Sequence, residues 1–246
     1  MQPEQHTDPT PTTESLTKKP RHSKKYERFG EVIRYLTIDE LQQLFDSIDN
    51  YNHKLMFEII YELGCRVGEF VRIQVKHLNF SRSTVFFPAE NTKTKYARAS
   101  YLPKGLMNEI RSMLKQKGVL TKRGDRVRRA EAYLFHPGKR WNRPYTENRI
   151  RQIFQRYVTK AGLQRVYGKD TCGRNLKMFT VHSLRHSHVM HYVVDRGLPL
   201  PIVQKQVGHR SLKTTSVYLR PSTEKIAEAY RTSHKNNERG LATIQE

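Results

Sequence analysis

The sequence is poor in cysteine. It contains only two cysteines, Cys65 and Cys172, which stand far apart and lack the close Cys-x-x-Cys spacing of a zinc ribbon. Two thiols also cannot build the disulfide framework that small secreted folds need. We therefore expect both cysteines to be free thiols in a reducing compartment.

Long apolar runs are also missing. Hydrophobic residues make up 36% of the chain, enough for a buried core, but no run approaches the roughly 20 apolar residues of a membrane-spanning helix. Residues 1–17 are polar and rich in proline and threonine, unlike the apolar centre of a secretory signal. These features predict a cytoplasmic protein with no membrane partner.

Acidic residues are scarce relative to basic ones. Lys and Arg total 45 and Asp and Glu total 23, which gives a formal net charge of +22. A field of this sign attracts polyanions, and phosphate neutralisation supplies most of a protein's sequence-independent affinity for nucleic acid. The composition therefore favours a DNA- or RNA-binding protein. The alternatives are a ribosome-like structural protein and a surface tuned only for solubility.

Two basic segments are candidates for contacts with nucleic acid. "KKPRHSKK" lies within residues 1–34, which we expect to form a disordered arm because they are polar and contain many prolines. "KRGDRVRR" is expected to form a surface loop. The candidate DNA-binding residues are Lys18, Lys19, Arg21, Lys24 and Lys25 in the arm and Lys122, Arg123, Arg126, Arg128 and Arg129 in the loop. For each segment the alternative is a solvated stretch without a ligand.

Apolar periodicity predicts a mainly α-helical fold with a small antiparallel β-sheet, in the α+β class. Thr37 followed by Glu40 matches a helix capping box. The β-rich segments "STVFFP" and "RASYLP" predict a hairpin with a long basic tip. We expect helices near residues 37–48, 53–63, 104–117, 146–161, 181–197, 201–207, 212–218 and 223–234, a short helix in "CRVGEFVRI", a short strand in "AYLFHP" and a loop at 164–179.

Three separated segments carry residues suited to phosphate chemistry. "ELGCRVGEF" places Arg66 in a tight turn between helices. "VHSLRHSHVMHY" places His182 and Arg185 at positions i and i+3, on one face of a helix start. "VGHRSLKTTSVY" places His209 nine residues before Tyr218.

The four histidines of the second segment raise the alternative of a zinc site. His182 and His186 have the i, i+4 spacing of an H-E-x-x-H motif. However, the residue after His182 is Ser rather than Glu, and the charge of Arg185 would repel a metal ion. We predict no metal and no other cofactor, and we interpret His188 and His191 as structural.

Taken together, the three segments resemble the tyrosine recombinase (phage integrase) family. Hallmarks of that family are an Arg after a helix-ending Gly with a Glu three residues later, an H-x-L-R-H box, and a G-H box with a Tyr nine residues after its His. The resemblance covers about residues 34–225, and any one box alone would be weak evidence. The matching residues are Gly64, Arg66 and Glu69, then His182, Leu184, Arg185 and His186, then Gly208, His209 and Tyr218, with Thr214 and Thr215 before the Tyr.

The resemblance implies a site-specific DNA recombinase or integrase that works without metal or ATP. The phenol of Tyr218 would attack the phosphodiester, forming a 3′-phosphotyrosine and freeing a 5′-hydroxyl. Arg66 and Arg185 would hold the non-bridging oxygens by bidentate hydrogen bonds. Their charge would also favour the phenolate of a Tyr whose ordinary pKa is ~10. His182 and His209 would add hydrogen bonds to the scissile phosphate, and His182 is also the candidate general base.

The resemblance further implies a lysine at the tip of the first hairpin that protonates the departing 5′-oxygen. Lys93 and Lys95 both lie in this tip. Counting from the start of the tip favours Lys93, and counting back from Pro103 favours Lys95. We favour Lys93 and keep Lys95 as the alternative. Glu69 and His186 are interpreted as supporting residues.

The implied organisation has three parts: a basic arm (1–34), a catalytic domain (35–222), and a C-terminal helix and tail (223–246) that is a candidate for exchange between protomers. The implied partners are double-stranded DNA with a specific target site and three further copies of the chain, in a homotetramer formed on DNA from monomers or weak oligomers. The protein would then be associated with the nucleoid.

Family members usually carry a DNA-clamping domain ahead of the catalytic domain, and residues 1–34 are too few for one. We expect a naturally short member whose basic arm substitutes for the clamp, with a truncated chain as the alternative.

Two other functions remain open at this point. A type IB topoisomerase-like nicking-closing enzyme would use the same chemistry without strand exchange. A DNA-binding regulator on a decayed recombinase fold would need the fold and the charge but not Tyr218.

Overall fold

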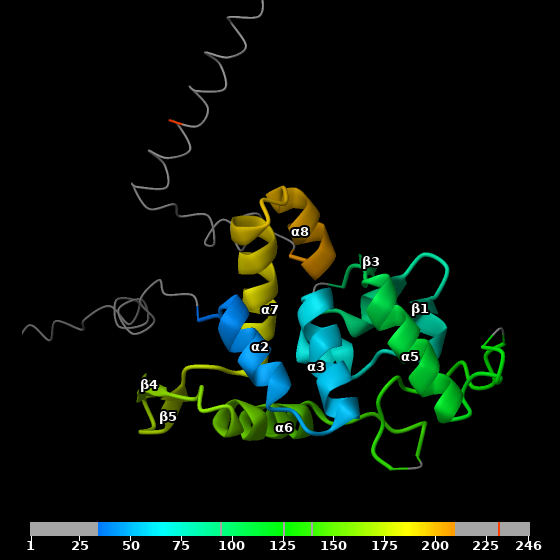
Figure 1. Ribbon diagram of the computed structural model, residues 1–246, viewed down its shortest axis with the longest axis horizontal. Coiled ribbons are helices and arrows are strands. Elements are labelled where there is room, and N and C mark those ends of the chain that lie inside the picture. Colours follow the sequence, from blue (N-terminus) through cyan, green and yellow to red (C-terminus); the bar gives the residue numbers. More distant parts are fainter. Residues whose placement is uncertain (1–33, 94, 125, 139, 210–230, 232–246) are drawn as a thin grey trace, which may run out of the picture. The chain divides into compact units, whose positions relative to one another are not determined.

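Helices make up most of the regular secondary structure (Figure 1). The computed structural model describes residues 34–93, 95–124, 126–138, 140–209 and 231. Its α-helices are α2 (Ile38–Asp46), α3 (Tyr51–Leu63), α4 (Val67–Phe70), α5 (Lys104–Gln116), α6 (Glu147–Lys160), α7 (Val181–Met190) and α8 (Leu200–Val207). Short 3-10 turns occur at η1 (Val75–His77) and η2 (Ala89–Asn91), and a π-helical turn occurs at η3 (His191–Asp195).

The strands form two small antiparallel sheets. One has the order β1 (Leu78–Asn79), β2 (Thr84–Phe87) and β3 (Arg98–Tyr101), and the other pairs β4 (Val166–Lys169) with β5 (Asn175–Lys177). The predicted mainly helical α+β class is therefore confirmed. Among the described residues, no helix is both long enough and apolar enough to span a membrane.

Local capping signals set the helix starts. Thr37 accepts a hydrogen bond from the Glu40 backbone N–H at 3.2 Å and Glu40 accepts one from the Thr37 N–H at 3.0 Å, so the predicted capping box is confirmed. Thr146 caps α6 in the same way, by accepting from Arg149. Asn50 caps α3, so this helix begins at residue 51, two residues earlier than predicted.

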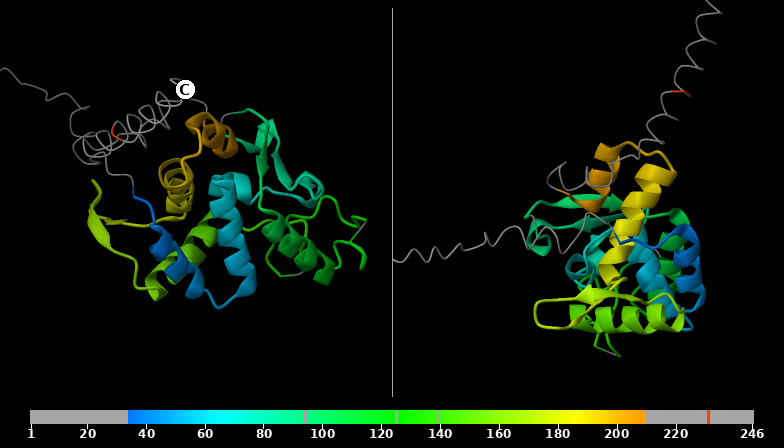
Figure 2. Two further views of the ribbon diagram at one scale, coloured as in Figure 1. Left: turned by 45° about the horizontal axis from the view of Figure 1, so that its top comes forward. Right: turned by 90° about the vertical axis from the view of Figure 1, so that its left-hand side faces the viewer.

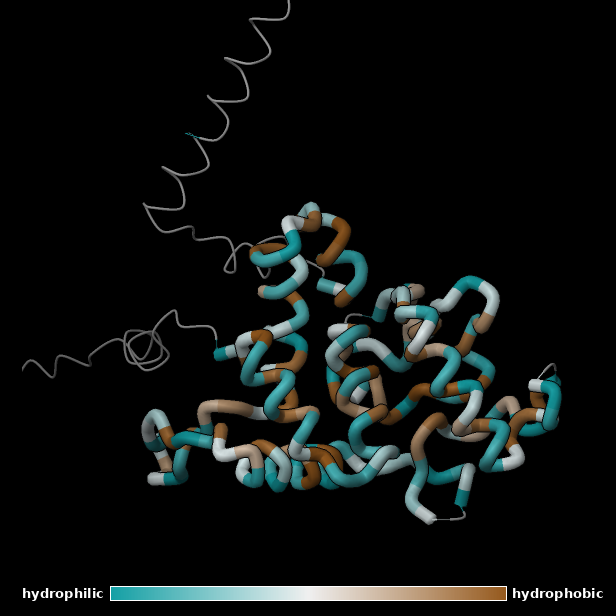
Figure 3. The backbone as a smooth tube through the Cα atoms, viewed as in Figure 1, coloured by the Kyte–Doolittle hydropathy of each residue, from teal (hydrophilic) through white to brown (hydrophobic). Residues whose placement is uncertain are grey.

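The core is built around α3, which packs against both α7 and α5. Its apolar side chains between Leu55 and Leu63 are buried, and Figure 3 shows hydrophobic residues recurring along the helices while the long connections are largely hydrophilic. The helix ends at Gly64, whose φ of +53° lies in the left-handed region. A Cβ at this position would come within 2.6 Å of Val207 and 2.9 Å of His188. Gly64 therefore lets the ends of α3, α7 and α8 meet.

Strand β3 is joined to the end of α8 by hydrogen bonds. The Ser100 hydroxyl donates to the Gln206 carbonyl at 2.7 Å. The side-chain amide of Gln206 accepts from the Tyr101 N–H at 2.9 Å and donates to the Tyr101 carbonyl at 2.8 Å. The β2–β3 hairpin and the C-terminal end of α8 are thus held together.

The sequence-based prediction was wrong at two places. Residues 164–179 contain the β4–β5 hairpin rather than a loop. Its reversal is stabilised by Asp170, whose carboxylate accepts from the N–H groups of Cys172 at 2.8 Å and Arg174 at 2.9 Å. The segment "AYLFHP" forms no strand: Tyr133 makes only an isolated bridge with Gln74, while Leu134 and Phe135 lie buried in the core.

The last third of the chain is described only to residue 209. Helix α7 begins at Val181 as predicted and continues through η3 to Asp195, just before Gly197. The helix predicted at 212–218 lies outside the described residues, and of the one predicted at 223–234 only residue 231 is described. Cys65 is a buried free thiol and Cys172 an exposed one.

The Gly64→Ala substitution should lower the free energy of unfolding by at least about 2 kcal/mol, because it combines a strained backbone with steric overlap. The matched control is Gly105→Ala in α5, where an added Cβ meets nothing within 4 Å. That control should be neutral or stabilising by up to about 1 kcal/mol through helix propensity. Urea unfolding measures both. If both substitutions change the free energy of unfolding equally little, the close approach of the three helices at Gly64 is contradicted.

Candidate active site

Arg66 lies at the start of α4, directly after the turn made by Gly64 and Cys65. Its guanidinium donates to Glu69 Oε1 at 3.1 Å, and its backbone N–H donates to Glu69 Oε2 at 3.0 Å. The Glu69 side chain is 2% exposed, whereas the Arg66 side chain is 27% exposed. Glu69 therefore orients a guanidinium that remains accessible from solvent.

Glu69 has a second cationic partner, Arg98 on β3. Arg98 donates to the carboxylate at 2.7 Å and stacks over Phe87 at 4.2 Å. Burial alone would raise the pKa of Glu69, but the hydrogen bond and charge of Arg98, together with the Arg66 N–H, lower the pKa below its ordinary value. The carboxylate is therefore ionised at neutral pH.

Arg98 was not predicted as a site residue. It packs so closely under Gly208 that a Cβ there would lie 2.7 Å from its guanidinium, so it connects Glu69 with the G-H box. The sequence did offer one signal for Arg98: a charged residue in the predicted strand "RASYLP", at a position where strands commonly carry an apolar residue.

Arg185 is 1% exposed, although it carries a full charge. Its Nη1 donates to the Gly64 carbonyl at 2.7 Å and to the Val207 carbonyl at 2.7 Å. These carbonyls lie at the C-terminal ends of α3 and α8, where helix dipoles favour a cation. Burial and then the charge of Arg66 lower the pKa of Arg185 to about 10, which leaves it protonated at neutral pH. Its Nη2 is buried and makes no hydrogen bond among the described residues.

Three histidines lie beside these arginines. The ring centroids of His182 and His186 lie 4.6 Å apart, and the rings meet edge to face. The pKa of His209 is lowered to about 3, first by burial and then by the charges of Arg185 and Arg66. Burial and the charge of Arg185 likewise lower the pKa of His186 to about 4. These residues are close enough to affect one another electrostatically.

The pKa of His182 is also lowered, first by the protein packed around its ring and then by His186, Arg185 and Arg66. This holds although the His182 residue as a whole is exposed to solvent at the pocket described next. All three imidazoles are therefore neutral at pH 7, and each has one donor and one acceptor nitrogen.

A pocket of about 750 Å³ brings Arg66 and His182 together with both hairpin lysines, Lys93 and Lys95. The tip that carries the lysines is closed by Thr92, whose hydroxyl accepts from the Tyr96 N–H at 3.1 Å. Lys95 has a φ of +58°, so the backbone turns sharply there. Both lysines line the pocket, and the geometry alone does not choose between them.

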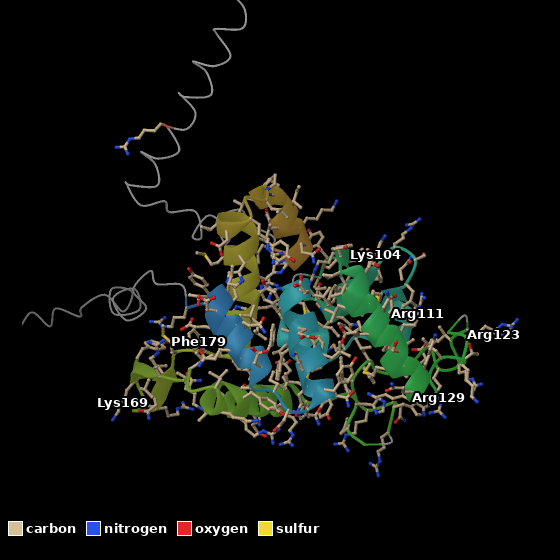
Figure 4. All side chains as sticks on the ribbon, in the orientation of Figure 1. Lys104, Arg111, Arg123, Arg129, Lys169 and Phe179 are labelled. Carbon is tan, nitrogen blue, oxygen red and sulfur yellow. The ribbon has the colours of Figure 1, made fainter. Side chains whose placement is uncertain are left out.

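Other predicted residues lie elsewhere. Lys122, Arg123, Arg126, Arg128 and Arg129 are exposed and do not line the pocket; Figure 4 shows Arg123 and Arg129 at the far end of the domain from Lys169. Tyr218 and the arm residues Lys18, Lys19, Arg21, Lys24 and Lys25 fall outside the described residues. No cluster of three or more His, Cys, Asp or Glu within the described ranges is arranged to hold a metal ion.

His188 and His191 lie in the core, as interpreted from the sequence. His191 Nε2 lies 2.9 Å from the Leu36 carbonyl and Nδ1 lies 3.0 Å from the Tyr61 hydroxyl. Because a carbonyl only accepts, Nε2 carries the proton and Tyr61 donates to Nδ1. His188 stacks on Tyr192 with ring centroids 4.3 Å apart.

Comparison with known proteins identifies the family. The model of the phage integrase family matches residues 34–225. The chain belongs to this family, the tyrosine recombinases. Tyrosine recombinase XerA of Pyrococcus furiosus is 28% identical to this member over 197 residues, covering 79% of this chain and 59% of the relative.

Two solved structures show the same fold as this family member. A XerA recombinase has a TM-score of 0.60 at 20% identity, covering 81% of this chain and 63% of that one. The site-specific recombinase XerH, solved in a pre-cleavage complex with its difH substrate, has a TM-score of 0.57 at 21% identity. The match covers 80% of this chain and 53% of the XerH chain. By sequence, this chain spans only about three fifths of the length of the Pyrococcus furiosus XerA relative.

The Glu69→Gln substitution should lower the free energy of unfolding at pH 7 by about 3 kcal/mol, because it removes the charge that compensates two arginines. The pKa of Glu69 is depressed in the folded state, so its contribution is present above its ordinary pKa of 4.5 and is lost as pH falls through the folded value. The gap between wild type and variant should therefore contract below about pH 4.5.

The control is Glu131→Gln, which removes the same charge from an exposed pair with Lys76. It should change the free energy of unfolding by less than about 1 kcal/mol. Denaturant titrations between pH 3 and pH 7 measure both variants. If the difference in free energy of unfolding between wild type and Glu69→Gln stays constant with pH, the buried carboxylate is not ionised as described.

Proposed function

We propose that the protein is a site-specific DNA recombinase that cleaves and rejoins duplex DNA through a covalent 3′-phosphotyrosine, without metal or ATP. The observation that carries this proposal is that residues from distant parts of the chain come close together. Arg66 and His182 line one pocket, and Arg185 bonds to the carbonyls of Gly64 and Val207, each two residues before Arg66 and His209 respectively. A net charge of +22 supports a polyanionic substrate.

The arginines fit a phosphodiester better than another substrate group. Arg185 Nη2 is a buried donor without a partner among the described residues, and such a donor is costly unless an acceptor fills it. A phosphate oxygen is a strong acceptor that would also offset the buried charge. Arg66 offers a second guanidinium from the pocket side. Together they would hold both non-bridging oxygens and stabilise the charge that develops there.

The remaining roles are those that the family resemblance implies, and the neutral histidines fit them. The Tyr218 phenol attacks phosphorus, a new P–O bond forms, and the bond to the 5′-oxygen breaks. His182 is neutral, so it can accept the phenol proton, and a bound phosphate would raise its pKa towards the useful range. His209 donates a hydrogen bond to the phosphate. Lys93 gives its proton to the departing 5′-oxygen, and His186 and Glu69 support the site.

The larger assembly is part of the same proposal. Residues 35–222 would form the catalytic domain, residues 1–34 a basic arm on the duplex, and residues 223–246 a helix and tail exchanged between protomers. Exchange of strands between two duplexes needs four active sites, so we expect a homotetramer on DNA at the nucleoid. The topoisomerase-like and regulator alternatives share the fold but differ in what they do to DNA.

The decisive test of function is covalent trapping on a nicked duplex. The duplex comes from selection of oligonucleotides that the protein binds, and the nick lets the cleaved strand diffuse away. Wild type should form a protein–DNA adduct stable to denaturation, and Tyr218→Phe should form none, because the phenol oxygen is the nucleophile. Tyr51→Phe, at an exposed tyrosine on α3, is the matched control and should retain the adduct.

Absence of an adduct with wild type on a bound site would contradict the proposal and favour a regulator. Relaxation of a supercoiled plasmid with one site, without exchange between two sites, would favour a topoisomerase-like enzyme.

The choice between Lys93 and Lys95 can be made with a substrate whose departing 5′-oxygen is replaced by sulfur. A thiolate is a far better leaving group and needs no proton. The Lys93→Ala substitution should slow cleavage of the normal substrate by about 100-fold or more, in the range of general-acid effects. The same variant should cleave the sulfur substrate at nearly the wild-type rate. Lys95→Ala is the matched control, expected to change both rates little. Reversed behaviour would assign the role to Lys95.

A further inference from the structure

We propose that the β4–β5 ribbon, residues 166–177, is a separate DNA-contacting element that grips the duplex beside the active site. This inference rests on the proposed function, because it takes double-stranded DNA as the substrate. It assigns a role to the one hairpin that was not expected from the sequence.

The two faces of the ribbon differ. The strand register pairs Val166 with Lys177 and Lys169 with Asn175, and paired residues point to the same side of a sheet. These four residues are exposed, whereas Leu176 on the opposite face is half-buried. One face of the ribbon therefore presents two lysines, an amide and an aliphatic side chain to solvent.

The lysines of this face are available for phosphates. Asp170 pairs with Arg174 at 3.2 Å, and Arg165, just before the ribbon, pairs with Glu40 at 3.2 Å. Within the described part of the chain, neither Lys169 nor Lys177 forms an ion pair. The acidic residues near the ribbon are thus engaged by the arginines, which leaves the lysine charges uncompensated.

The ribbon is held firmly at its base. The Gln164 side-chain amide accepts from the Phe179 N–H at 3.1 Å and donates to the Phe179 carbonyl at 2.8 Å. Gln155 donates to the same carbonyl, and Arg34 stacks on Tyr167 with 3.4 Å to the ring centroid. A solvated hairpin needs no such anchoring. A rigid element loses less entropy when it binds.

The position of the ribbon relates it to the active site. Phe179 lies two residues before α7, which carries His182 and Arg185. In the right-hand view of Figure 2, the ribbon and the β1–β3 sheet project from the same side of the domain. The pocket is lined by the β2–β3 tip and by the start of α7. A duplex lying across the pocket would therefore extend towards the ribbon.

The shape and chemistry of the exposed face suit a groove. A two-stranded ribbon fits the major groove of B-DNA, which is ~12 Å wide. Lysines at its edges would contact phosphates, while Asn175 could pair with an adenine edge and Val166 could contact a thymine methyl group. We therefore expect affinity from the lysines and some sequence preference from Asn175.

The test uses the full-length chain and a fluorescein-labelled duplex of mixed sequence, with binding measured over a series of salt concentrations. Lys169→Ala/Lys177→Ala should reduce the magnitude of the slope of log K against log salt by about 2, since each phosphate contact contributes ~0.9. The matched control is Lys54→Ala/Lys104→Ala, which removes the same charge from α3 and α5; Figure 4 shows Lys104, at the start of α5, well away from Lys169. The control should leave the slope unchanged.

Equal slopes for the ribbon variant and wild type would overturn the proposal, as would equal losses in both variants, which would indicate a general charge effect. Hydroxyl-radical footprinting provides a second measurement: the ribbon variant should lose protection on one flank only, and unchanged protection on both flanks would also overturn it.

Covalent trapping separates this result from the proposed function. Suppose that wild type binds with a steeper salt dependence than Lys169→Ala/Lys177→Ala and yet forms no adduct. In that case the recombinase proposal fails and the ribbon contact stands. If wild type does not bind duplex DNA at all, both fail.

Discussion

The site depends on one buried guanidinium. Arg185 bonds to the carbonyl oxygens of Gly64 and Val207 through a single nitrogen, and so joins the end of α3 to the end of α8. The residues that follow these two helix ends are Arg66 and His209. A charge at this depth is costly, and dipoles at two helix C-termini offset only part of that cost. The remaining Nη2 is an unpaired donor that an anion would satisfy, which supports the proposed phosphate site.

A second layer of interactions fixes what surrounds Arg185. Glu69 holds Arg66 and Arg98, and Arg98 lies beneath Gly208. The amide of Gln206 joins β3 to α8. The hairpin that presents the lysines, the turn that presents Arg66 and the segment that presents His209 are consequently positioned against one another before substrate binds. Preorganised donors of this kind need little rearrangement during reaction.

Local signals made much of this predictable from the sequence. The capping box at Thr37 and the helix-ending Gly64 act within a few residues, so spacing alone revealed them. The grouping of Arg66, His182, Arg185 and His209 followed from a family resemblance, because periodicity cannot bring distant segments together. Arg98 was missed because its partner Glu69 is distant in sequence. The β4–β5 ribbon was missed because its charged, glycine-containing strands lack clear apolar alternation and its reversal depends on Asp170.

The central claim is that the Arg66 guanidinium and the unpaired Nη2 of Arg185 together receive one backbone phosphate of a duplex. A crystal structure of the Tyr218→Phe variant bound to duplex DNA tests it most directly. The account predicts one phosphate whose non-bridging oxygens lie within hydrogen-bonding distance of Arg185 Nη2 and of the Arg66 guanidinium, beside His182 and His209. A complex in which Arg185 Nη2 donates to no phosphate oxygen, with the DNA backbone passing elsewhere, would contradict it.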